Sequence, residues 1–208
     1  MAEMSGYRET GPAPGELAHP ALALVNSRRN SPNGPLDELA SPVSLRAWLR
    51  EHGFGGVGRC GFDDAAALRE LRGAVREVLL ARIEERTPDQ SAVGVVNQAA
   101  AAAPSAPGLE WAAGGPVQVR QRAGARGIAL ARALLAADAI ELLVGEDHAD
   151  LRACAAPGCI RLLLRDHPRR QWCSIRCGDR VRASRYYHRH RSPAGEATSS
   201  PRTSAARW

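Results

Sequence analysis

Four cysteines in the last third of the chain could together hold a metal ion. They follow the pattern Cys154-x4-Cys159-x13-Cys173-x3-Cys177. Two close pairs joined by a short loop suit a tetrahedral zinc site, because each pair can bind one edge of the ion. Four thiolates leave no open position for water, so the pattern predicts a structural Zn²⁺ rather than a catalytic one. Disulfides are the alternative, and they are disfavoured because residues 1–17 lack the apolar segment of a secretory signal.

Positive charge is concentrated around these cysteines. Residues 161–191 contain ten arginines and two aspartates, a formal charge of +8, whereas the whole chain carries only +6, which leaves −2 for the rest. The segment keeps roughly +6 when four thiolates and one Zn²⁺ are included. A basic patch on a compact module is typical of a polyanion binder, and a solvated arginine surface is the alternative.

The local sequence predicts how the zinc module folds. Pro157-Gly158 lets residues 154–159 turn so that both sulfurs face one metal. The apolar run 160–164 is expected to be a strand, and residues 171–173 are expected to return as a second strand. Ser174 has the features of a helix N-cap, with the helix running to about His190.

Helical spacing predicts which side of this last helix packs inward. Cys177, Val181, Ser184 and His188 share one face, and the metal bound by Cys177 directs that face toward the module. Arginines then project from both flanks, where they could follow a phosphate backbone or enter a groove. The candidate nucleic-acid contacts are Arg169, Arg170, Arg176, Arg180, Arg182, Arg185 and Arg189.

Apolar periodicity predicts helices over most of the preceding chain. Ser41 is expected to cap a helix that starts at Pro42, with Leu45, Trp48 and Leu49 as its buried stripe. Further expected elements are a helix at 63–86, a helix from a capping box at 87–90 to about 103, a hairpin within 109–121, and a helix at 126–144.

The expected fold is mainly α with a small β-hairpin. A helical N-terminal domain at residues 19–147 is followed by a small C-terminal ββα-like zinc finger at residues 148–191. Residues 1–18 and 192–208 are rich in Pro, Gly, Ser and Thr and are expected to be disordered.

Several function classes find no support in the sequence. The segment Gly53-Phe-Gly-Gly-Val-Gly58 lacks the Lys-Ser/Thr of a phosphate-binding loop, and no catalytic set of residues is found, so an enzyme is not expected. No apolar run reaches 18 residues, so a membrane span is not expected. Asn26 could line a small-molecule pocket, or it could satisfy backbone groups at the end of an element.

The finger resembles a known family. The segment 170–180, Arg-Gln-Trp-Cys-Ser-Ile-Arg-Cys-Gly-Asp-Arg, together with Arg152 to Cys159, is similar to the CGNR zinc finger, with Asp179 at the signature's third position. That finger follows the ABATE domain in bacterial proteins classed as stress-induced transcription regulators. The segments 22–27 and 39–49 resemble parts of ABATE, so the similarity covers residues 19–190. The resemblance implies zinc binding and DNA binding.

The sequence therefore favours a cytoplasmic transcription regulator whose finger binds zinc and DNA. Its helical domain would sense a ligand or dimerise, which leaves room for a small-molecule effector and a homodimer. The alternative is a zinc-containing module that binds RNA or a protein partner without recognising a promoter.

Overall fold

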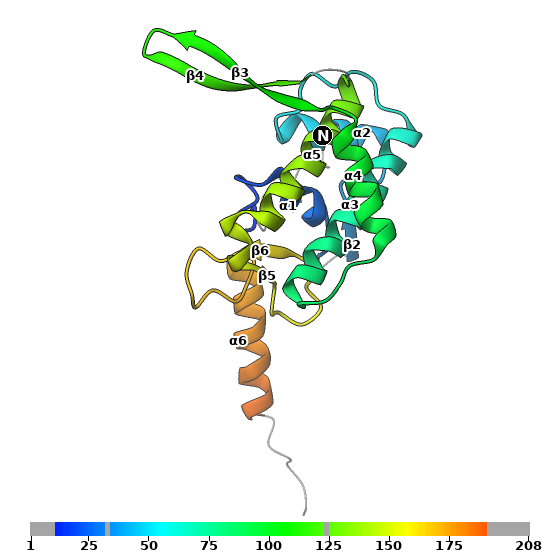
Figure 1. The fold of residues 1–208 in the computed structure, drawn as a ribbon. Helices are drawn as coiled ribbons and strands as arrows, with labels where there is room; N and C mark the ends of the chain where they lie inside the picture. Colours follow the sequence, from blue (N-terminus) through cyan, green and yellow to red (C-terminus); the bar gives the residue numbers. More distant parts are fainter. Residues whose placement is uncertain (1–10, 32–33, 123–124, 191–208) are drawn as a thin grey trace, which may run out of the picture.

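The computed structural model describes residues 11–31, 34–122 and 125–190 of the chain (Figure 1). Five helices form the body: α1 (Pro20–Asn26), α2 (Pro42–Glu51), α3 (Phe62–Ile83), α4 (Gln90–Ala101) and α5 (Gly127–Val144). α3 packs against the other four, and α4 also lies along α5. The prediction of a mainly α fold is confirmed.

Helix α3 supplies much of the core. Its apolar residues Leu68, Leu71, Val75, Val78 and Leu79 are buried, because residues three and four apart lie on one side of a helix. The expected end near residue 86 is too late, since the helix stops at Ile83.

Helix α2 begins as predicted. The Ser41 hydroxyl accepts the backbone N–H of Ser44, and the Ser44 hydroxyl accepts the N–H of Ser41, so the capping box is complete. Leu45, Trp48 and Leu49 are buried. The local sequence is thus sufficient to define this helix and its buried face.

Helix α4 forms, but not through the predicted capping box at residues 87–90. Its N-cap is Asp89, whose side chain makes no capping hydrogen bond. The Asp89 backbone N–H instead reaches Glu77 Oε1 at 3.3 Å, and Glu77 also binds Arg86. An ion pair from α3 therefore holds this turn in place of a local cap.

Three two-stranded antiparallel sheets occur within the described residues. β1 (Arg28–Ser31) pairs with β2 (Gly34–Asp37), a hairpin that the sequence analysis missed because its strands are short and polar. β3 (Ser105–Ala112) pairs with β4 (Gly115–Arg122) as predicted, over a longer span. This second hairpin extends away from the helices (Figure 1).

The third sheet corrects the predicted strand pairing in the finger. β6 (Leu162–Leu164) pairs with β5 (Leu151–Ala153), which follows the 3₁₀ helix η1 (Glu146–Asp150), and residues 171–173 form no strand. Gln171 accepts one hydrogen bond from the Ala155 N–H, but the Cys173 N–H donates to a sulfur. The backbone at 171–173 is therefore used by the cysteine cluster and not by a strand ladder.

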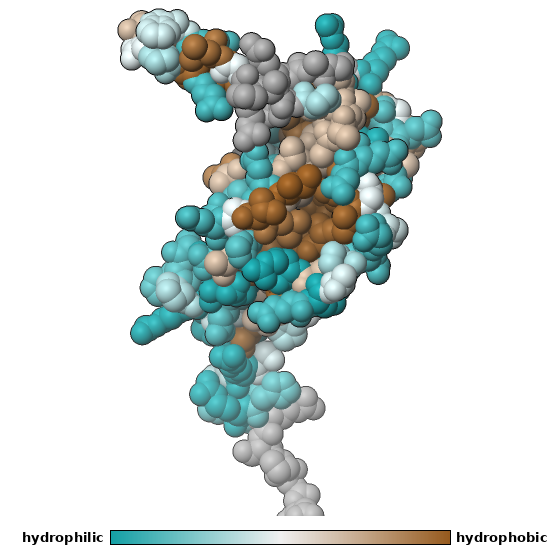
Figure 2. All heavy atoms as spheres, viewed as in Figure 1, coloured by the Kyte–Doolittle hydropathy of each residue, from teal (hydrophilic) through white to brown (hydrophobic). Residues whose placement is uncertain are grey.

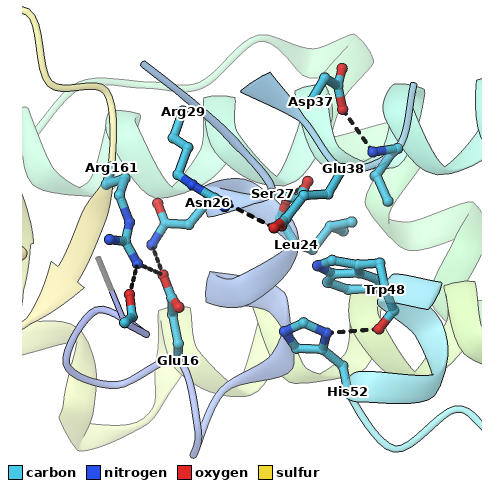
Figure 3. Close-up of polar contacts among 12 residues, drawn as sticks. Glu16, Leu24, Asn26, Ser27, Arg29, Asp37, Glu38, Trp48, His52 and Arg161 are labelled. Atoms are coloured by element: carbon cyan, nitrogen blue, oxygen red, sulfur yellow. Dashed lines mark hydrogen bonds and ion pairs between the residues drawn. The ribbon is translucent and has the colours of Figure 1, made fainter. Parts of the chain in front are cut away.

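Side chains of the body complete the backbone hydrogen bonding of β6. Asn26, at the end of α1, accepts the Leu162 N–H at 2.8 Å and donates to the Leu162 carbonyl at 2.8 Å. Its amide also donates to Glu16 at 2.6 Å, and Glu16 forms an ion pair with the buried Arg161 at 2.8 Å (Figure 3). Asn26 thus satisfies backbone groups, and the finger begins on a strand fixed to the body.

Residues 11–18 pack against this strand, which corrects the expectation that residues 1–18 are disordered. Ala13 is buried beside Leu163, and the Leu164 N–H donates to the Pro14 carbonyl at 2.9 Å. Gly15 has a φ of +93°, and an added Cβ would meet Leu164 at 2.7 Å, so only glycine fits there. Residues 1–10 and 192–208 lie outside the described residues.

None of the helices described here combines the length and the apolar character needed to cross a lipid bilayer.

The finger strands share the core of the helical body. Leu151 of β5 and Leu162 of β6 belong to the same buried cluster as the helical core.

Replacing Asn26 with Ala should strongly destabilise the chain. The buried N–H and C=O of Leu162 would each lose a partner, at about 1–3 kcal/mol per group. Urea unfolding followed by circular dichroism measures this loss. Asn97→Ala, at an exposed position of α4, is the control and should shift the midpoint little. An unchanged midpoint for Asn26→Ala would show that these hydrogen bonds contribute nothing net.

Candidate metal centre

The four cysteines converge as the sequence predicts. Their Sγ atoms all lie within 4.8 Å of one another, and Cys173 is 3.7 Å from both Cys159 and Cys177. A tetrahedral zinc with Zn–S bonds of about 2.3 Å places its sulfurs about 3.8 Å apart. A disulfide requires about 2.05 Å, and all four cysteines are free, so the disulfide alternative is wrong. The donor set and its spacing fit Zn²⁺.

Two local structures present the sulfurs in pairs. Cys154 follows β5 and donates its N–H to the Arg161 carbonyl at 3.0 Å, and Cys159 ends a turn in which Gly158 has a φ of +71°. Cys173 and Cys177 flank the start of α6 (Ile175–His190). There the Ser174 hydroxyl accepts the Cys177 N–H at 3.3 Å, as expected of the predicted N-cap.

The thiols interact strongly with one another. Hydrogen bonds from Cys159 and Cys173 lower the pKa of Cys154. The hydrogen bond to Cys154 raises the pKa of Cys159 to about 11, and hydrogen bonds to Cys154 and Cys159 raise the pKa of Cys173, because a thiol that donates a hydrogen bond holds its proton more tightly. A bound divalent cation would replace these protons and allow all four thiols to ionise.

Two arginines offset the charge of the centre. Four thiolates and one Zn²⁺ would carry −2. Arg180 donates to Cys177 Sγ at 3.9 Å. Arg161 is buried: burial would lower its pKa, but Glu16 and the nearby Cys173 and Cys159 raise it. These cations sit where the negative charge of a filled centre would lie.

A tryptophan packs directly against the start of α6. A Cβ added to Gly178 would lie 3.0 Å from the ring of Trp172 and 3.2 Å from the Arg182 guanidinium. Arg182 also lies over the Trp172 ring, with its Cζ 5.8 Å from the centroid. A glycine within a helix is a sequence signal for such a close approach, and the sequence analysis did not use it.

The predicted nucleic-acid contacts are on the surface, but they differ in their partners. Arg170 pairs with Asp166, Arg182 pairs with Asp179, and Arg180 donates to Cys177. The side chains of Arg169, Arg185 and Arg189 have no partner among the described residues. Arg176 is also exposed. Two other arginines of the basic segment form ion pairs instead: Arg161 pairs with Glu16, and Arg165 pairs with Asp150.

The predicted inward face of α6 holds only for its first turns. Val181 is buried with the cysteine cluster, but Ser184 and His188 are exposed, as is every residue from 182 to 190. Helical spacing alone could not indicate this, because it identifies a face without showing how far the protein extends beneath it.

Two family models match the chain. The ABATE model, described as "Putative stress-induced transcription regulator", matches residues 18–146. The CGNR zinc finger model matches residues 151–190. Both agree with the resemblance found in the sequence. No curated protein matches the chain.

The chain should bind one zinc ion, and Cys173→Ser should abolish that binding. Structural zinc typically contributes ~10 kcal/mol or more to folding, so the finger should lose structure on chelation. Elemental analysis of protein purified without chelators measures the stoichiometry, and Cys60→Ser, outside the cluster, should keep the metal. Zinc-free wild-type protein would contradict the assignment.

Gly178→Val should loosen the finger by forcing Trp172 and Arg182 away from α6. Overpacking of this kind costs about 1–3 kcal/mol. Zinc release to a chelator should become faster. Gly94→Val, in α4 with open space around its Cβ, makes the same change in helix propensity and should leave the rate unchanged. Equal release from both variants would show that the ring contact is unimportant.

Proposed function

We propose that this chain, which belongs to the ABATE family and carries a CGNR zinc finger, is a cytoplasmic bacterial transcription regulator that binds duplex DNA through α6. The observation that supports this most directly is the exposure of the second half of α6, where every residue from 182 to 190 is exposed to solvent. In the ribbon view α6 extends from the body as a single rod (Figure 1).

The dimensions of α6 suit a DNA groove. Its 16 residues span about 24 Å at 1.5 Å per residue. The major groove of B-DNA is about 12 Å wide and admits an α-helix. The cysteine cluster and the Ser174 cap fix the first turns of α6, so the exposed part would enter the groove without first having to be ordered.

The charge of α6 also suits DNA. The helix contains five arginines and a single acidic residue, Asp179. Arg185 and Arg189 are available for phosphates, since neither has a partner in the described protein. Arg182 is held by Asp179 in an exposed ion pair, and such pairs contribute at most about 1 kcal/mol, so a phosphate could replace the carboxylate.

The helical body would serve regulation and not catalysis. We assign to it the sensing of a small molecule or the formation of a homodimer. The two hydrogen bonds between Asn26 and Leu162 support a regulatory role, because they link the body to the strand that precedes the second cysteine pair.

A second candidate is an RNA-binding module, favoured by the tyrosines of α6. Tyr187 is 71% exposed and Tyr186 is 56% exposed, and exposed aromatic rings between arginines can stack on unpaired bases. Competition between duplex DNA and single-stranded RNA for the same protein distinguishes the two candidates.

Replacing Arg185 and Arg189 together with Ala should weaken binding to duplex DNA and flatten its salt dependence. The slope of log K against log salt should fall by about 0.9 for each lost phosphate contact. Fluorescence anisotropy with genomic DNA fragments at several salt concentrations measures both quantities.

The double variant Arg46→Ala, Arg50→Ala is the charge-matched control. Both residues are exposed on α2, far along the chain from the finger, and their loss should leave the slope unchanged. Equal effects of the two double variants would mean that only net charge matters and that α6 is no specific interface.

A further inference from the structure

A hydrophobic hollow lies on the surface of the helical body, remote in sequence from the cysteines. It encloses about 230 Å³ where the end of α3 meets α4 and α5. Its wall is formed by Val78, Val93, Val96, Ile140 and Leu143. Figure 2 shows a hydrophobic patch at this place, bordered by hydrophilic residues. Soluble proteins seldom leave a concave apolar surface of this kind without a use.

Polar groups stand at one side of the hollow. Arg82 and Arg86 come from the end of α3 and its following turn, and Asn97 comes from α4. Arg86 is neutralised by Glu77 and Glu84 at 2.6 and 2.7 Å. The Arg82 guanidinium and the Asn97 amide have no hydrogen-bond partner within the described part of the chain.

The charge balance limits what can bind. The residues lining the hollow include no acidic side chain, and only Arg82 brings a cation that no neighbour neutralises. One uncompensated cation beside an apolar wall complements a ligand with one negative charge and an apolar body. A phosphate ester, with its higher charge, is a poorer match.

The volume limits the size of that ligand. Pockets for drug-sized molecules measure about 300–1,000 Å³, so a hollow of 230 Å³ suits a single ring or a short branched chain. Its concave shape favours a small molecule over the flat surface of a second copy of the chain.

We propose that this hollow binds a small apolar monocarboxylate, with its body against Val93, Ile140 and Leu143 and its carboxylate on Arg82 and Asn97. The role of such a ligand as the effector of transcription rests on the function proposed above. Its binding does not, because binding can be measured without DNA.

Isothermal titration calorimetry of the full chain with sodium benzoate, phenylacetate and hexanoate tests the proposal. At least one should bind saturably with one site per chain, and benzyl alcohol should bind about tenfold more weakly than benzoate, because it lacks the charge-assisted hydrogen bonds. Arg82→Gln should lower carboxylate affinity about tenfold and leave benzyl alcohol unaffected. Arg46→Gln, a matched change on α2, should have no effect.

Val93→Phe separates the hollow from the cation. The larger side chain should fill the space and abolish binding of both the acids and the alcohol, while circular dichroism stays native. The proposal is overturned if no carboxylate of the three binds saturably, or if Arg82→Gln binds as tightly as the wild type.

Two further outcomes are also decisive. A concentration-dependent dimer that Ile140→Glu dissociates, with no carboxylate binding, would assign this surface to a second copy of the chain and overturn the ligand site. Carboxylate binding by a protein that fails to bind DNA would support the site and refute the proposed regulator.

Discussion

The backbone of β6 needs hydrogen-bond partners on both of its edges, and the rest of the architecture follows from how these are supplied. β5 pairs with one edge, and the side chain of Asn26 supplies a donor and an acceptor to Leu162 on the other. A buried peptide group without a partner is costly, so the strand cannot leave α1 without unfolding locally. The strand that follows Cys159 is therefore held by the helical body as well as by its own sheet.

Charge reinforces this connection. Arg161 lies between the carboxylate of Glu16 and the cysteine cluster, and the same Glu16 accepts a hydrogen bond from Asn26 (Figure 3). A buried arginine is tolerable only where anions face it; here residues 11–18 supply Glu16, and the thiolates of a filled metal centre would supply the others. Glu16 of the N-terminal segment, Asn26 of the body and the candidate metal centre are thus linked through Arg161. A change in any one of them alters the electrostatic environment of the others.

The two ends of α6 serve different purposes. Its first turns are fixed by Cys177, by the Ser174 cap and by the contact of Gly178 with Trp172. Its later turns have no supporting surface and retain solvated arginines. Rigidity at one end and exposure at the other suit a helix that must be presented to a partner, because little conformational entropy remains to be lost on binding. The hollow between α3, α4 and α5 lies in the part of the molecule where packing leaves apolar side chains incompletely covered.

The sequence by itself determined the features that depend on local chemistry. The cysteine spacing predicted the cluster, the caps Ser41 and Ser174 predicted the starts of α2 and α6, and apolar periodicity predicted α3 and α5, since each depends on residues a few positions apart. Tertiary structure alone decided that β6 pairs with β5, that Arg161 is buried on Glu16 instead of joining the basic surface, and that residues 11–18 are ordered. These features join residues up to about 150 positions apart, and no local pattern encodes which distant backbone group or charge will be the partner.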